Sequence, residues 1–138
     1  MTPTLRGRWQ TRLLLLLTAG VGITALFGIL YQDFQTVFAI LGYMLGFGLV
    51  WDIVYSRLQS RRWDHDWPPA LYLAGAVWEI IFFVVSMQFI ELPGVPSDFG
   101  IIQFIFQYGA IGVVSFIIMF GPIRILFPRW RFRGGQWL

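Results

Sequence analysis

Four apolar segments separated by short polar stretches dominate the hydrophobic pattern of the chain. Each is close to the roughly 20 residues that an α-helix needs to cross the hydrocarbon core of a bilayer. The pattern therefore predicts an all-α membrane protein with four transmembrane helices in an up-down bundle. The polar connections are too short for another domain, so residues 1–138 are expected to form one domain. We place its spans at 13–31, 36–55, 69–90 and 99–121, followed by an amphipathic, aromatic and arginine-rich tail at 122–138.

The first apolar segment resembles a signal peptide at its start, because three arginines precede five consecutive leucines. The apolar run nevertheless resumes at Val21 and reaches Tyr31, which gives it the length of a full span. We therefore expect an uncleaved first helix.

Small residues recur at every fourth position in the first two segments. Such faces let membrane helices approach each other closely. We expect two helix-packing faces, directed at other helices of the chain or at a partner, and formed by Gly20, Thr24 and Gly28 and by Gly42 and Gly46.

Composition narrows the class of protein. Charged residues make up 12% of the chain, whereas an ordinary soluble domain has about 25%. The absence of cysteine excludes disulfides, thiolate metal sites and a cysteine nucleophile. No nucleotide-binding glycine loop and no serine, histidine and aspartate set is recognisable, so a conventional enzyme is not expected.

The basic residues predict the orientation of the helices. Four spans place all ten arginines on one side of the membrane and Asp33, Glu91 and Asp98 on the other. By the positive-inside rule, both termini and the central loop face the cytoplasm. The expected location is a bacterial inner membrane or a thylakoid-type membrane. This asymmetry accounts for the net charge of +3, so no nucleic-acid partner is expected.

Two similar hexapeptides each place a carboxylate inside an apolar segment: Gly48 to Ile53 contains Asp52, and Gly75 to Ile80 contains Glu79. In an antiparallel hairpin around His65, these two carboxylates lie at similar heights. A charge at this depth is costly and usually faces the protein interior or water. One interpretation is a structural strut, hydrogen-bonded or paired with an arginine such as Arg57 or Arg124. Others are a proton or ion relay, a metal site, a lipid headgroup site and a pigment contact.

The loop between the hexapeptides contains the only histidine, His65. Adjacent residues alternate sides in an extended loop and no second histidine is available, so no metal site is expected. His65 could supply at most one axial ligand to a chlorophyll-type pigment or haem, and the cofactor remains unknown. The simplest interpretation is a solvated cytoplasmic loop that carries Arg61, Arg62, Asp64, His65 and Asp66.

The tail alternates basic and aromatic residues, a composition typical of the membrane interface. Arginines bind anionic lipid headgroups, and aromatic rings lie at the boundary of the bilayer. The predicted contacts, with anionic lipid or with a protein partner, are made by Arg129, Trp130, Arg131 and Arg133.

These patterns favour a non-enzymatic accessory or assembly subunit of a larger membrane complex, in contact with other membrane subunits or with copies of itself. One alternative is an oligomeric transporter or channel for protons, ions or small solutes that uses Asp52 and Glu79. Another is a membrane-embedded protein that modifies lipids or binds a pigment or metal.

Overall fold

A computed structural model describes residues 2–137, and all the regular structure in this range is helical. Four helical stretches are long and apolar enough to cross a membrane: 5–31, 34–60, 69–89 and 101–126. The protein is therefore classed as an integral membrane protein. The elements are α1 (Leu5–Leu15), a π-helical turn η1 (Leu16–Gly20), α2 (Val21–Tyr31), α3 (Phe34–Ser60), α4 (Pro69–Phe89), α5 (Ile101–Phe120), α6 (Pro122–Leu126) and α7 (Pro128–Phe132).

The first helix begins two turns earlier than the sequence pattern predicts. The hydroxyl of Thr4 accepts a hydrogen bond from the amide of Gly7, which caps α1 at its amino end. Arg8 and Arg12 therefore lie within a helix and not in a flanking segment. The predicted span starts at Leu13, where the apolar pattern begins, and the helix extends beyond it because these arginines find partners inside the protein.

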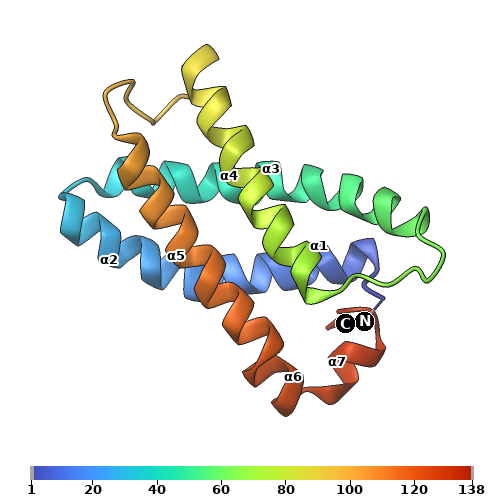
Figure 1. Cartoon of the computed structure of the whole chain (residues 1–138). Coiled ribbons are helices and arrows are strands. Elements are labelled where there is room, and N and C mark those ends of the chain that lie inside the picture. Colours follow the sequence, from blue (N-terminus) through green and yellow to red (C-terminus); the bar gives the residue numbers. More distant parts are fainter. Residues whose placement is uncertain (1, 138) are drawn as a thin grey trace.

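The helices form two crossed layers (Figure 1). In one layer α1 and α2 run antiparallel to α3, and in the other α4 runs antiparallel to α5. The expected hairpin of the second and third spans is thus splayed, because α4 crosses α3 at a steep angle. Both termini and loop 61–68 lie at one end of the molecule, and the connections α2–α3 and α4–α5 lie at the other.

The two small-residue faces have different surroundings. A Cβ added at Gly20 would lie 3.2 Å from Leu41, and one added at Gly28 would clash with the ring of Phe34, so this face packs closely against α3. Gly42 and Gly46 are exposed, and a Cβ on either would meet no atom within 4 Å. The second face therefore has no neighbour within the described chain.

The carboxyl-terminal tail folds back onto the amino terminus. Trp130 is 3% exposed, and its indole Nε1 donates a hydrogen bond to the hydroxyl of Thr11 at 3.0 Å. The amide of Thr4 donates to the carbonyl of Gly134 at 2.9 Å, which holds the two ends of the chain together. Trp130 therefore packs inside the protein, while the exposed tail arginines are Arg129, Arg131 and Arg133.

We predict that Trp130→Ala releases the tail. The substitution removes a buried indole and its hydrogen bond, and replacing a buried tryptophan with alanine costs about 3–5 kcal/mol. Limited trypsin digestion in detergent should cleave the tail of this variant at least several times faster than that of the wild type. The matched control is Phe132→Ala, because Phe132 is 82% exposed and its loss should leave the cleavage rate unchanged.

Candidate functional site

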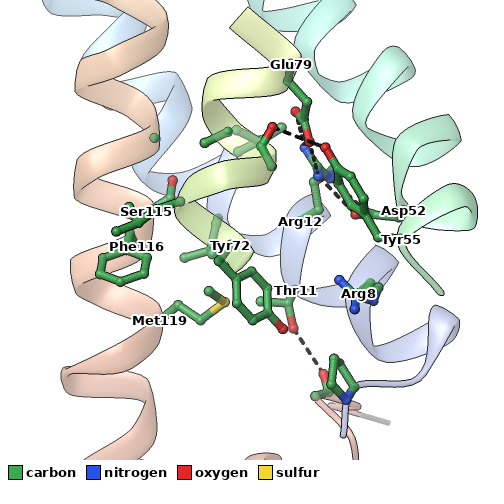
Figure 2. Close-up of a pocket in the computed structure, with 18 of the residues that line it drawn as sticks. Arg8, Thr11, Arg12, Asp52, Tyr55, Tyr72, Glu79, Ser115, Phe116 and Met119 are labelled. Atoms are coloured by element: carbon green, nitrogen blue, oxygen red, sulfur yellow. Dashed lines mark hydrogen bonds and ion pairs between the residues drawn. The ribbon is translucent and has the colours of Figure 1, made fainter. Parts of the chain in front are cut away.

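An ion cluster lies where the two layers cross, and Arg12 is at its centre (Figure 2). Arg12 Nε and Nη2 donate to the two carboxylate oxygens of Asp52 at 2.9 and 3.0 Å. Arg12 Nη2 and Nη1 also donate to the two oxygens of Glu79 at 3.0 and 3.2 Å. One guanidinium therefore bridges carboxylates from α3 and α4.

Two tyrosines complete the coordination of Glu79. The Tyr108 hydroxyl on α5 donates to Glu79 Oε2 at 2.6 Å. The Tyr55 hydroxyl on α3 lies 3.1 Å from Glu79 Oε1 and 3.1 Å from the carbonyl oxygen of Gly75. The cluster thus connects all four spanning stretches through polar contacts.

The glycines of the repeated hexapeptides make room for the partners of the acids. Gly48 lies one turn before Asp52, and a Cβ at this position would overlap the guanidinium of Arg12. Gly75 lies one turn before Glu79, and a Cβ there would come within 3.2 Å of the Tyr55 ring. In each hexapeptide, glycine on the same helix face as the acid lets the donor side chain reach it.

The tryptophans of the hexapeptides also meet. The rings of Trp51 and Trp78 pack edge to face, with centroids 5.6 Å apart. The repeated tryptophans therefore meet where α3 and α4 cross (Figure 1).

The two carboxylates are buried, and each of their oxygens accepts at least one hydrogen bond. Asp52 is 3% exposed and Glu79 is 6% exposed. Burying a charge costs the free energy of its hydration, and this cost is offset only when partners with good geometry replace the water. Here the guanidinium and the tyrosines are those partners. This arrangement connects the helices through the carboxylates and leaves none of their four oxygens without a donor.

Sequence reasoning missed the central residue. Arg57 is exposed, and the guanidinium of Arg124 lies over the ring of Phe120 at 5.9 Å, so neither is the partner of the acids. The sequence contained one signal for Arg12. Thr4 can cap a helix that begins before Leu13, and such a helix includes Arg12 next to the apolar segment. No pattern indicates which of the ten arginines reaches the carboxylates.

A buried arginine lies one turn before Arg12. Arg8 is 6% exposed, and its Nη2 donates to Gln59 Oε1 at 2.8 Å. Its guanidinium lies over the rings of Trp67, at 4.7 Å, and Tyr72, at 5.7 Å. Arg8 is therefore packed among aromatic rings at the end of the molecule that contains both termini.

A cavity of about 160 Å³ separates these two arginines from α5 (Figure 2). Its polar lining comes from all four spanning stretches, and its apolar lining lies on α4 and α5 and also on the amino-terminal stretch, α3 and the tail. The polar lining residues include Arg8, Thr11, Arg12, Asp52, Tyr55, Tyr72, Glu79, Tyr108 and Ser115.

The central loop is separate from the ion cluster. His65 is exposed and has a left-handed backbone, with φ of 50°. Hydrogen bonds from the Arg62 guanidinium to Asp64 hold the pKa of that carboxyl below its usual value. Asp66 donates its backbone amide to Asp64, and Arg61 is exposed. Within residues 2–137 no three histidine or acidic side chains are grouped so that they could hold a metal ion.

We predict that Arg12→Gln strongly destabilises the protein. Removing one partner of a buried ion pair costs about 3–5 kcal/mol, because the carboxylates remain buried without a counter-charge. Thermal unfolding in detergent should show the loss, and adding Asp52→Asn to the variant should recover part of it. Arg57→Gln is the control, since Arg57 is exposed. An Arg12→Gln variant as stable as the wild type would contradict a structural role for the cluster.

A second prediction compares two glycines of α3. Gly48→Ala should lower stability by roughly 1–3 kcal/mol, the usual range for overpacking, because its methyl group displaces the Arg12 guanidinium. Gly46→Ala meets open space and should be neutral or stabilising by up to about 1 kcal/mol through helix propensity. Denaturation of both variants in the same detergent measures the difference, and equal effects would count against this explanation.

Comparison with known proteins adds no relative. No protein-family model matches the chain, and no curated protein or solved structure shows significant similarity to it. The function is therefore argued from the geometry of the site.

Proposed function

We propose that this protein is a non-enzymatic accessory or assembly subunit of a larger membrane complex. The observation that carries this proposal is that all four carboxylate oxygens of Asp52 and Glu79 accept hydrogen bonds from Arg12, while two tyrosine hydroxyls also lie within hydrogen-bond distance of Glu79. A carboxylate whose oxygens are already occupied by a guanidinium is suited to holding helices and poorly suited to exchanging protons or ions. The intramembrane charges thus serve the architecture of the subunit.

The proposed orientation places both termini and loop 61–68 in the cytoplasm. These segments share one end of the molecule (Figure 1), and the loop contains Arg61 and Arg62. Asp33 and Glu91 belong to the connections at the opposite end. The unequal distribution of arginine between the two ends supports this orientation, because the positive-inside rule places basic loops in the cytoplasm. A bacterial inner or thylakoid-type membrane is the proposed location.

The proposed contact with another membrane helix is the exposed face of α3. Gly42, Gly46 and Val50 follow each other at intervals of four residues, and all three are exposed. Close approach of backbones over small residues is a common way for membrane helices to associate. The same chemistry operates inside the chain, where Gly20 and Gly28 pack against α3.

Transport by an oligomer is the second candidate, because Asp52 and Glu79 border the cavity. A proton or ion path also needs polar groups across the rest of the membrane. Between residues 80 and 90 and between 99 and 123, however, the chain has no charged residue. The buried Gln107 lies within the second of these uncharged stretches. Its side-chain amide is already engaged, because it donates to the Val37 carbonyl at 2.9 Å. The accessory role therefore has more support.

The test is isolation from the native membrane in a mild detergent. We expect the wild type to be recovered with other membrane subunits, and Gly46→Leu to lose them while keeping its thermal stability. Gly22→Leu is the matched control, because Gly22 on α2 is likewise exposed and free of neighbours. Recovery only as a homo-oligomer that conducts protons or ions in liposomes, with flux lost in Glu79→Gln, would establish transport instead.

A further inference from the structure

Two buried polar atoms that line the cavity have no hydrogen-bond partner. They are Arg8 Nε and Ser115 Oγ, on α1 and α5. Figure 2 shows both residues around the same space, with Tyr72 between them. Buried donors normally find a partner, so these atoms indicate a cavity that receives a polar molecule.

Arg8 brings to the cavity a guanidinium that, among the described residues, lacks a carboxylate within ion-pair distance. Its side-chain partner is the neutral amide of Gln59, and within residues 2–137 it forms no ion pair. The two carboxylates that also line the cavity are held by Arg12. The rings of Trp67 and Tyr72 cover the guanidinium of Arg8 and limit its access to water. An anionic group is therefore the complementary ligand.

The apolar lining determines the rest of the ligand. Leu73, Ala76, Gly112 and Phe116 line the cavity on α4 and α5. Leu73 is exposed and the other three are half-buried, so this side of the lining borders the outer surface of α4 and α5. A molecule bound at Arg8 can thus extend a hydrocarbon chain into the bilayer. A cavity of this size in a protein core accepts a benzene-sized group.

We propose that this cavity binds the anionic headgroup of a membrane lipid. Phosphate oxygens of the headgroup accept from Arg8 Nε, and the Ser115 hydroxyl donates to an oxygen farther along the molecule. The acyl chain leaves between α4 and α5. Arginine suits this role because guanidinium donors form strong charge-assisted bonds with phosphate. The proposal is independent of the accessory role.

The test measures lipid binding to the purified full-length protein in nanodiscs of phosphatidylcholine. Fluorescently labelled phosphatidylglycerol should bind at one saturable site and remain bound at 0.5 M salt, because a buried site is screened less than surface arginines. Arg8→Gln should weaken this binding about tenfold or more, the effect of losing one charge-assisted hydrogen bond. Arg131→Gln is the control for surface attraction, since Arg131 is exposed.

A pair of glycine variants tests the site without touching a buried charge. An added Cβ at Gly112 or at Gly109 meets no atom within 4 Å, but of the two only Gly112 lines the cavity. Gly112→Leu should therefore occlude the cavity and abolish saturable binding, whereas Gly109→Leu should bind as the wild type does. Both variants should keep the wild-type unfolding temperature.

Three results would overturn the proposal. The first is equal binding of phosphatidylcholine and phosphatidylglycerol, and the second is unchanged binding in Gly112→Leu. The third is equal affinity for inorganic phosphate alone, which would make the site one for a soluble anion. Failure of Arg8→Gln to fold would leave the glycine pair to decide.

Discussion

The guanidinium of Arg12 between two buried carboxylates is the interaction on which the rest of the structure depends. Asp52 and Glu79 belong to helices that cross steeply, and neither acid could stay charged in this apolar setting without a partner. Arg12 supplies that partner from a third helix, and Tyr108 adds a donor from a fourth. Three spanning helices are therefore tied to one planar group, and the fourth is tied to Glu79, one of its partners.

Glycine makes this geometry sterically possible. The guanidinium passes over Gly48, and the Tyr55 ring packs against Gly75. Each glycine lies one helical turn before the acid, on the same face, where any larger side chain would displace the donor. The similarity of the hexapeptides thus has a physical explanation in helix packing, and it requires no duplication of a larger unit.

Arg12 also determines the polarity of the neighbouring cavity. Both carboxylates form their ion pairs with Arg12, so the direct side-chain partner of Arg8 is the neutral amide of Gln59, beside two aromatic rings. At the end of the molecule that holds both termini, the cavity consequently presents a guanidinium without a direct ion-pair partner among residues 2–137, and α4 and α5 supply part of its apolar wall. The structural role of Arg12 and the ligand preference that we infer for Arg8 thus both follow from the pairing of the two carboxylates with Arg12.

The sequence by itself determined the class of protein and four helical segments, because the apolar runs match the thickness of a bilayer. It also singled out Asp52 and Glu79, since isolated carboxylates in apolar helices need partners. Only the tertiary structure decided that Arg12 is their partner, that Trp130 is buried and that Gly42 and Gly46 have no neighbour within the described chain. These features depend on the crossing of the two layers and on the fold of the chain ends, which bring together residues 40 to 119 positions apart. Local hydrophobic periodicity carries no information about such long-range pairing.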